Sequence, residues 1–337
     1  MSTETITPPN PARIAWFPVR GRVSWFEILL LLMACALVVS GIAPNLQDVV
    51  LLSFLFGGLA LAWNIAGGYA GLLSFGHSAF FGVGAYTSTI LLLRYNLTPW
   101  IGIWIGALIA AVFGAALALI CARLRGPFFI LSTLAFAEVV RIGALNWASL
   151  TGGAEGLSIM PAPDPLGMVF ASKTSYAALM LFYLVAVYAV TKALEASRFG
   201  YYLFAIRDNE EAASAAGVDP LLGRTAALAL SAALTGIGGS LFAQYFLYLD
   251  PTYVISPELS FQFALLPAVG GLGTAIGPVL GSFLITPLSE LLRSYLGSSA
   301  VGLHLVIYSF GLIVVMLYFP AGLAGALDKL TRRKRSP

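Results

Sequence analysis

The sequence predicts an all-α polytopic membrane protein with about 8–10 transmembrane or half-membrane helices. Of its 337 residues, 59% are hydrophobic and only 10% are charged, and its mean hydropathy is +0.90. Soluble domains carry roughly 25% charged residues, so too few charges are present to cover a water-soluble fold of this size. The apolar runs are continuous and about 20 residues long, as membrane helices require, whereas the strands of a membrane barrel alternate apolar and polar residues.

The elements follow one another along the chain with short connections. Residues 1–25 are polar and basic and are expected to form a cytoplasmic tail. The first apolar run is 26–43; a cleaved signal peptide is the alternative, but the run is long for one and more spans follow at once. The further predicted spans are 47–66, 72–93, 99–122, 128–148, 174–195, 224–247, 258–271, 276–293 and 301–319. A transmembrane domain is therefore expected over 26–325, with a basic cytoplasmic tail over 326–337.

Two glycine-rich stretches, 67–71 and 270–273, interrupt this pattern of predicted spans. Residues 258–271 are too few to cross a hydrocarbon core of roughly 30 Å, so with 276–293 they are expected to form a broken helix or a re-entrant pair. Non-helical backbone at membrane depth must be buried in protein or line a wet cavity, so such breaks point to a translocation path. Close helix packing is the alternative. The candidate pathway or helix-break residues are Asn64, Gly67, Gly68, Ser74, His77, Tyr86, Gly270, Gly271 and Gly273.

Three polar side chains inside predicted spans need an explanation. Glu138 and Arg141 are three residues apart and share a helix face, so an intramembrane ion pair is expected. A lone charge at mid-membrane costs on the order of 2.5–3.5 kcal/mol, which pairing reduces. The pair is either a gate or cavity element, or structural glue between helices. His77 supports a broken helix or lines a cavity; no second metal ligand stands near it in the sequence, and no metal or cofactor motif is found.

The basic residues predict the orientation. Of 18 Lys and Arg residues, 14 fall in four places: the N-terminal tail, Arg123 and Arg125, the 192–224 region, and the C-terminal tail. An even number of predicted crossings separates each of these places from the next. Both termini and the loop 196–224 are therefore expected in the cytoplasm, and the basic C-terminal tail can also rest on anionic lipid.

The loop 196–224 is expected to contain a short helix over 205–217. Ala and Glu favour helix, Asp208 or Asn209 can cap its start, and Gly217 suits the residue that ends it. An alanine face allows close docking to another protein. An amphipathic helix on the membrane surface is the alternative, but the segment has few large apolar anchors. The predicted coupling residues are Arg207, Asp208, Glu210, Glu211, Ala212, Ala213, Ala216 and Gly217.

The pattern Glu211-Ala212-Ala213 followed by Gly217 matches the EAA loop of ABC-importer permeases. The chain resembles, almost end to end, the permeases of the branched-chain amino-acid ABC transporter family, LivM type. The stretches that carry the resemblance are 64–77, 80–86, 123–126, 133–138, 150–157, 270–281 and 319–323. One departure is that Val218-Asp219-Pro220 follows the loop, where some importers continue with Ile-x-Leu-Pro; this puts the helix length in doubt.

The resemblance implies a permease subunit of an ATP-driven importer in the bacterial inner membrane. It implies a heterodimer with a second homologous permease, two ATPase subunits and a periplasmic substrate-binding protein. No phosphate-loop motif occurs, so this chain is not expected to bind ATP or act as an enzyme, and no nucleic acid is expected as a partner. Branched-chain amino acids, urea, short amides and aromatic acids all remain possible solutes. A secondary transporter and a membrane-embedded enzyme are the rival functions.

Overall fold

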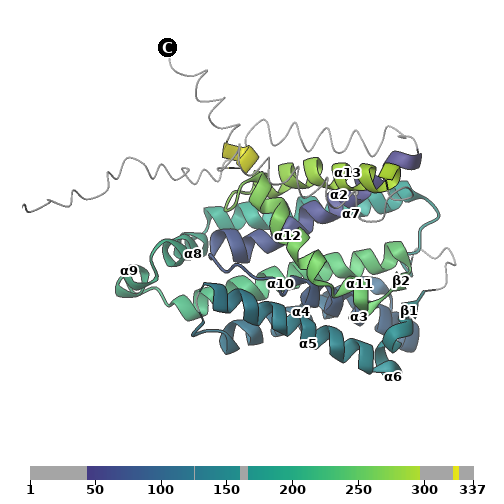
Figure 1. The fold of residues 1–337 in the computed structure, drawn as a ribbon, viewed down its shortest axis with the longest axis horizontal. Helices are drawn as coiled ribbons and strands as arrows, with labels where there is room; N and C mark the ends of the chain where they lie inside the picture. Colours follow the sequence, from purple (N-terminus) through teal and green to yellow (C-terminus); the bar gives the residue numbers. More distant parts are fainter. Residues whose placement is uncertain (1–43, 125, 160–165, 297–321, 326–337) are drawn as a thin grey trace, which may run out of the picture.

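The computed structural model describes residues 44–124, 126–159, 166–296 and 322–325, and in this part the chain is a bundle of long helices (Figure 1). The predicted spans 26–43 and 301–319 and both tails lie outside the described residues. The long helices are α2 (Pro44–Asn64), α3 (His77–Tyr95), α4 (Pro99–Ile120), α5 (Pro127–Asn146), α7 (Lys173–Ala196), α10 (Pro220–Phe246) and α13 (Ile276–Leu296). Among the described residues, five helical stretches are long and apolar enough to cross a membrane: Gln47–Tyr69, Pro99–Ile120, Pro127–Asn146, Lys173–Ala196 and Pro220–Phe246.

Shorter elements connect these helices at the two ends of the bundle. They are η2 (Ile65–Tyr69), α6 (Ala148–Thr151), η3 (Gly153–Glu155), α8 (Arg198–Asp208), α9 (Glu210–Ala215), α11 (Pro251–Val254), α12 (Pro257–Gly270), β1 (Leu157–Ser158) and β2 (Tyr248–Leu249). The strands pair antiparallel, with Leu157 opposite Leu249. In Figure 1, α8 and α9 extend from one end of the bundle, and the strand pair lies at the other.

The sequence marks most helix starts locally. Proline occupies the first turn of α4, α5, α10 and α12, where its missing N–H costs no helical hydrogen bond. Side-chain caps precede several of the same helices: Asp219 accepts hydrogen bonds from the first turn of α10, and Ser256 accepts one from the first turn of α12. The predicted starts of α4, α5 and α12 agree with the structure to within one residue, whereas α3 begins at His77, five residues after its predicted start, and α10 begins at Pro220, four residues before its predicted start.

Contacts between helices establish their relative directions. Lys173 pairs with Asp48 at the start of α7 and α2, and Glu195 bonds Tyr69 at their ends, so these two helices run parallel. Ser231 contacts His77, and Ser240 donates a hydrogen bond to the carbonyl of Gly84, so α10 and α3 are also parallel. These directions agree with the prediction, in which α2 and α7 cross the membrane in one direction and α3 and α10 cross it in the other. The side of the membrane on which each end lies stays a prediction.

Both predicted helix breaks are present. At the end of α2 the chain tightens into the π-helical turn η2 and then runs without helix from Ala70 to Gly76. The short helix α12 turns at Gly271 and returns as α13, against which it packs. The close approach of Gly270 to the backbone carbonyl of Gly277 fixes this hairpin, because a Cβ at position 270 would collide with that carbonyl. The 258–293 region is therefore a hairpin of two helices that turns at Gly271.

The prediction of one helix over 205–217 is wrong. Two helices, α8 and α9, meet at Asn209, whose backbone is extended at φ −157° and ψ 103°. Asn209 leaves the helical conformation because its side chain accepts the Ala212 N–H at 3.0 Å as the N-cap of α9. The predicted glycine stop is confirmed, since Gly217 has φ +85° and Val218 N–H reaches back to the Ala213 carbonyl.

Candidate functional site

The two helix breaks lie against each other at the end of the bundle where α8 begins. Asn64, the last residue of α2, accepts a hydrogen bond from the Gly273 N–H at 3.0 Å and donates one to the Thr274 carbonyl at 3.0 Å. Gly68 approaches so closely that a Cβ there would collide with the Asn64 side chain and with the Gly273 backbone. The sequence predicted each break separately, and the structure joins them through one amide side chain.

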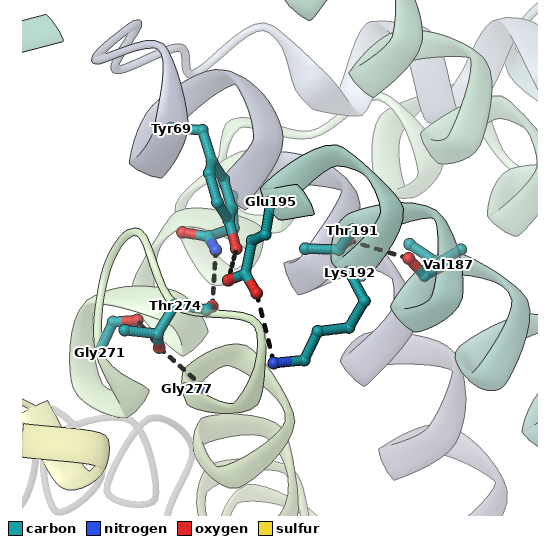
Figure 2. Close-up of polar contacts among 9 residues, drawn as sticks. Tyr69, Val187, Thr191, Lys192, Glu195, Gly271, Thr274 and Gly277 are labelled. Carbon is teal, nitrogen blue, oxygen red and sulfur yellow. Dashed lines mark hydrogen bonds and ion pairs between the residues drawn. The ribbon is translucent and has the colours of Figure 1, made fainter. Parts of the chain in front are cut away.

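Thr274 fixes the turn on the α12–α13 side of this junction. Its hydroxyl donates to the Gly271 carbonyl at 2.9 Å and accepts the Gly277 N–H at 3.1 Å, as Figure 2 shows. These two bonds satisfy backbone groups that the turn leaves without helical partners. The turn is therefore a defined structure that Asn64 can hold through its backbone.

A buried polar group borders η2 on the opposite side. The Tyr69 hydroxyl donates to Glu195 Oε1 at 2.6 Å, and Lys192 Nζ lies 3.3 Å from the other carboxylate oxygen (Figure 2). Glu195 is buried, so its charge depends on these two partners. Sequence reasoning missed this group, although Lys192 and Glu195 have the same three-residue spacing that identified Glu138 and Arg141.

Arg207 joins the predicted coupling segment to this junction. Its Nη1 donates to the Gly68 carbonyl at 2.7 Å, and its guanidinium lies 5.0 Å from the centre of the Phe204 ring. The Phe204 ring packs against Tyr69 at 5.1 Å. The last turn of α8 therefore contacts the helix break at both Gly68 and Tyr69. Arg207 faces the membrane helices, while the neighbouring Asp208 pairs with its Nε at 3.1 Å.

The rest of the coupling segment, α9, projects beyond the junction. Glu210 binds both terminal nitrogens of Arg224 at 3.1 Å, which ties α9 to the base of α10. Ala213 is buried against this base. Glu211, Ala212, Ala216 and Gly217 are exposed, so the small-residue face that the sequence predicted is available for docking.

The remaining predicted pathway residues hold helices together. His77 is fully buried, and its Nε2 lies 2.8 Å from the hydroxyl of Ser231, which itself donates to the Ala62 carbonyl at 2.6 Å. The Ser74 carbonyl accepts the Trp63 indole N–H at 2.7 Å. These bonds agree with the helix-support interpretation of His77. The other members occupy close-packed positions: Gly67 against the Trp63 ring, Gly271 at the end of α12, and Tyr86 at 3.5 Å from the Leu249 carbonyl.

The predicted ion pair of Glu138 and Arg141 is confirmed on α5. Arg141 Nε donates to Glu138 Oε2 at 2.8 Å, and a second bond joins Nη2 to Oε1. The two side chains are 40% and 25% exposed, so the pair is on the surface of this chain and is not buried within its bundle.

A bundle of membrane-length helices with two paired helix breaks defines a polytopic membrane permease. A profile of the family described as "Branched-chain amino acid transport system / permease component" matches residues 45–319. The chain belongs to this family. It is therefore a multi-pass membrane permease of an ABC transporter, as the sequence predicted.

Three relatives place it within the family. It is similar to the high-affinity branched-chain amino acid transport system permease protein LivM of Escherichia coli, 30% identical over 82% of this chain and 69% of that protein. The LivH permease protein of Salmonella typhimurium is 23% identical over 79% of this chain and 90% of its own length. The nucleoside ABC transporter permease protein NupC of Lactococcus lactis is 24% identical, over 77% and 87%. No solved structure matches the chain.

Proposed function

We propose that this chain is the LivM-type permease of an ATP-driven importer in the bacterial inner membrane and that residues 198–217, the coupling segment, dock onto a separate ATPase subunit. The coupling segment, both termini and the basic tails 1–25 and 326–337 then lie in the cytoplasm. The strand pair β1–β2 lies on the opposite side, where a substrate-binding protein delivers the solute. Two ATPase subunits and a second homologous permease complete the transporter.

The hydrogen bond between Arg207 and Gly68 is the observation that carries this proposal. A docked ATPase that moves α9 also moves α8, because only Asn209 separates the two helices. Arg207 and Phe204 then move the π-helical end of α2, and Asn64 passes that movement to the α12–α13 turn. Helices respond to such a displacement as near-rigid bodies, so a shift at the coupling segment reaches both helix breaks.

The docking surface consists of the exposed residues of α9. Small side chains at Ala212 and Ala216 permit close approach of a partner, and Glu211 supplies a charge near the start of the helix. The bond between Glu210 and Arg224 keeps this surface in a fixed orientation relative to α10. This docking surface suits a groove on another protein better than it suits a lipid surface, because it carries few large apolar side chains.

Branched-chain amino acids or related small solutes are the proposed cargo. The LivM and LivH relatives are named for branched-chain amino acids, and a nucleoside permease also resembles the chain. Because the chain resembles both LivM and LivH proteins, which differ from each other, a heterodimer of two homologous permeases is the proposed arrangement. The binding protein supplies much of the selectivity.

The test is co-purification followed by ATPase and uptake assays on the reconstituted transporter. Glu211→Arg in this chain should release the ATPase subunits and stop ATP-dependent uptake while the permease still inserts. Glu155→Arg is the matched control, since it makes the same charge change at an exposed position at the opposite end of the bundle, and it should retain the ATPase subunits. Wild-type ATPase retention and uptake in Glu211→Arg would overturn the coupling role. Uptake by the wild-type permease alone on an ion gradient would favour a secondary transporter.

A further inference from the structure

Three ionisable side chains gather on one exposed face of the membrane bundle. Glu138 and Arg141 pair on α5, and Glu258 is exposed in the first turn of α12, a helix that packs against α5. Figure 1 shows α5 along one edge of the bundle. Only 22% of its most apolar 18-residue stretch is buried within the chain, the smallest share among the five membrane-length helices of the described part. The charges are therefore on a face that the described part of the chain leaves largely uncovered.

The position of Glu138 along α5 indicates mid-membrane depth for the ion pair. Glu138 follows Pro127, the first residue of α5, by eleven positions, which places it roughly 16 Å along the helix axis. The hydrocarbon core is about 30 Å thick, so neither headgroup region is within reach of a side chain as short as Glu138.

Lipid is a poor neighbour for this face. Ionised side chains at the bilayer centre are costly and in membrane proteins almost always face the bundle interior or a water-filled cavity. Glu138 is 40% exposed, and Glu258 is also exposed. Pairing with Arg141 neutralises only one of the two carboxylates, so the cluster keeps a surplus negative charge. Water or a charged solute satisfies that surplus, whereas acyl chains do not.

Aromatic rings border the charges on the same face. Phe261 is one helical turn beyond Glu258 on α12, so the two side chains share a side of that helix. The Phe261 ring packs against the Phe75 ring with centroids 4.5 Å apart, and Phe261 is 48% exposed. The face therefore offers an apolar platform next to a carboxylate and a guanidinium.

We propose that this face lines the solute pathway and forms a transient binding site for a zwitterion with an apolar side chain. Glu258 receives the ammonium group; within the described part of the chain its carboxylate accepts no hydrogen bond. Arg141 receives the carboxylate through Nη1, because its two bonds to Glu138 use Nε and Nη2. Phe75 and Phe261 contact the apolar side chain. The inference rests on the proposed importer function, and the second permease closes the other side of the pathway.

Cysteine labelling tests whether water reaches this face. The two natural cysteines are replaced, and Gln262→Cys is introduced one turn from Glu258, which leaves all three charges in place. Phe182→Cys is the control: Phe182 is exposed in the middle of the span α7, whereas Gln262 is half-buried. In the assembled transporter a membrane-impermeant methanethiosulfonate should label position 262 and leave position 182 unlabelled. Saturating L-leucine with its binding protein should slow the labelling. No labelling at 262, or labelling that leucine does not slow, would overturn the inference.

Charge removal tests the solute contact itself. Glu258→Gln should raise the KM for L-leucine uptake roughly tenfold, as expected for the loss of one charge-assisted hydrogen bond, and should leave ATPase binding unchanged. If KM is unchanged in Glu258→Gln while the wild type shows normal ATP-dependent uptake, the proposed solute site is rejected and the proposed importer function is retained. Failure of the wild type to take up leucine with ATP rejects the proposed function, and the labelling result stands apart from it.

Discussion

Arg207 Nη1 donates a hydrogen bond to the Gly68 carbonyl across 2.7 Å and so links α8 to the π-helical end of α2. The two residues are 139 positions apart in the chain. Gly68 occupies a turn in which backbone carbonyls lose their regular helical partners, and a guanidinium is a strong donor for such an acceptor. Through this hydrogen bond the coupling segment contacts a helix break of the membrane domain directly.

Arg207→Gln should uncouple ATP hydrolysis from transport. The substitution removes a hydrogen bond from a charged donor, a contact worth about 1.5–3 kcal/mol, and the stacking of the guanidinium on Phe204. Because Arg207 faces the bundle, the docking surface on α9 stays intact. We expect normal co-purification of the ATPase and a large drop in uptake per ATP hydrolysed. Arg123→Gln, at an exposed arginine, is the control; loss of ATPase binding in Arg207→Gln would place this residue in the docking surface instead.

Asn64→Ala should destabilise the junction of the two breaks. It leaves the Gly273 N–H and the Thr274 carbonyl without their partner, and each unmet group costs about 1–3 kcal/mol. Thermal unfolding of the detergent-solubilised permease measures the loss. Asn146→Ala is the control, because the amide of Asn146 is exposed and bonds only to the Ile142 carbonyl within its own helix. Equal melting temperatures for the two variants would contradict the role of Asn64.

Two glycine-to-alanine substitutions should have opposite effects. Gly68→Ala places a Cβ against Asn64 and the Gly273 backbone, so we expect loss of both folding stability and transport. Gly143→Ala adds a methyl group to an exposed helical position with open space around it, and should stabilise α5 by up to about 1 kcal/mol. The comparison of unfolding temperatures and uptake rates separates close backbone approach from ordinary helix propensity. A tolerated Gly68→Ala would show that the two breaks can separate.

Glu195→Gln should be more damaging than loss of a surface ion pair. The buried carboxylate serves both Lys192 and Tyr69, and removal of one partner from a buried pair costs about 3–5 kcal/mol. Lys173→Ala removes an exposed partner of Asp48 and should cost less than about 1 kcal/mol. Denaturation of both variants in the same detergent measures the difference. Similar losses would mean that Lys192 finds another counter-charge.

Sequence reasoning succeeded where the signal was local. Apolar run length predicted the spans that became α2, α3, α4, α5, α7 and α10, and the shortness of 258–271 predicted that α12 does not cross the membrane alone. The spacing of Glu138 and Arg141 predicted their ion pair. The expected cap at Asn209 is confirmed, but the predicted bounds 205–217 were wrong because they ran across that cap: α8 ends at Asp208 and α9 begins at Glu210.

The sequence by itself determined three things: that this chain is a membrane protein, at which residues its helices break, and which family it belongs to. Hydropathy, glycine breaks and motif spacing are properties of short stretches, so each could be recognised without the tertiary structure. The tertiary structure decided that both breaks meet, that Arg207 holds one of them, and that α12, which carries Glu258, packs against α5. Those contacts join residues far apart in the chain. They depend on the packing of helices that are distant in sequence, which no local pattern encodes.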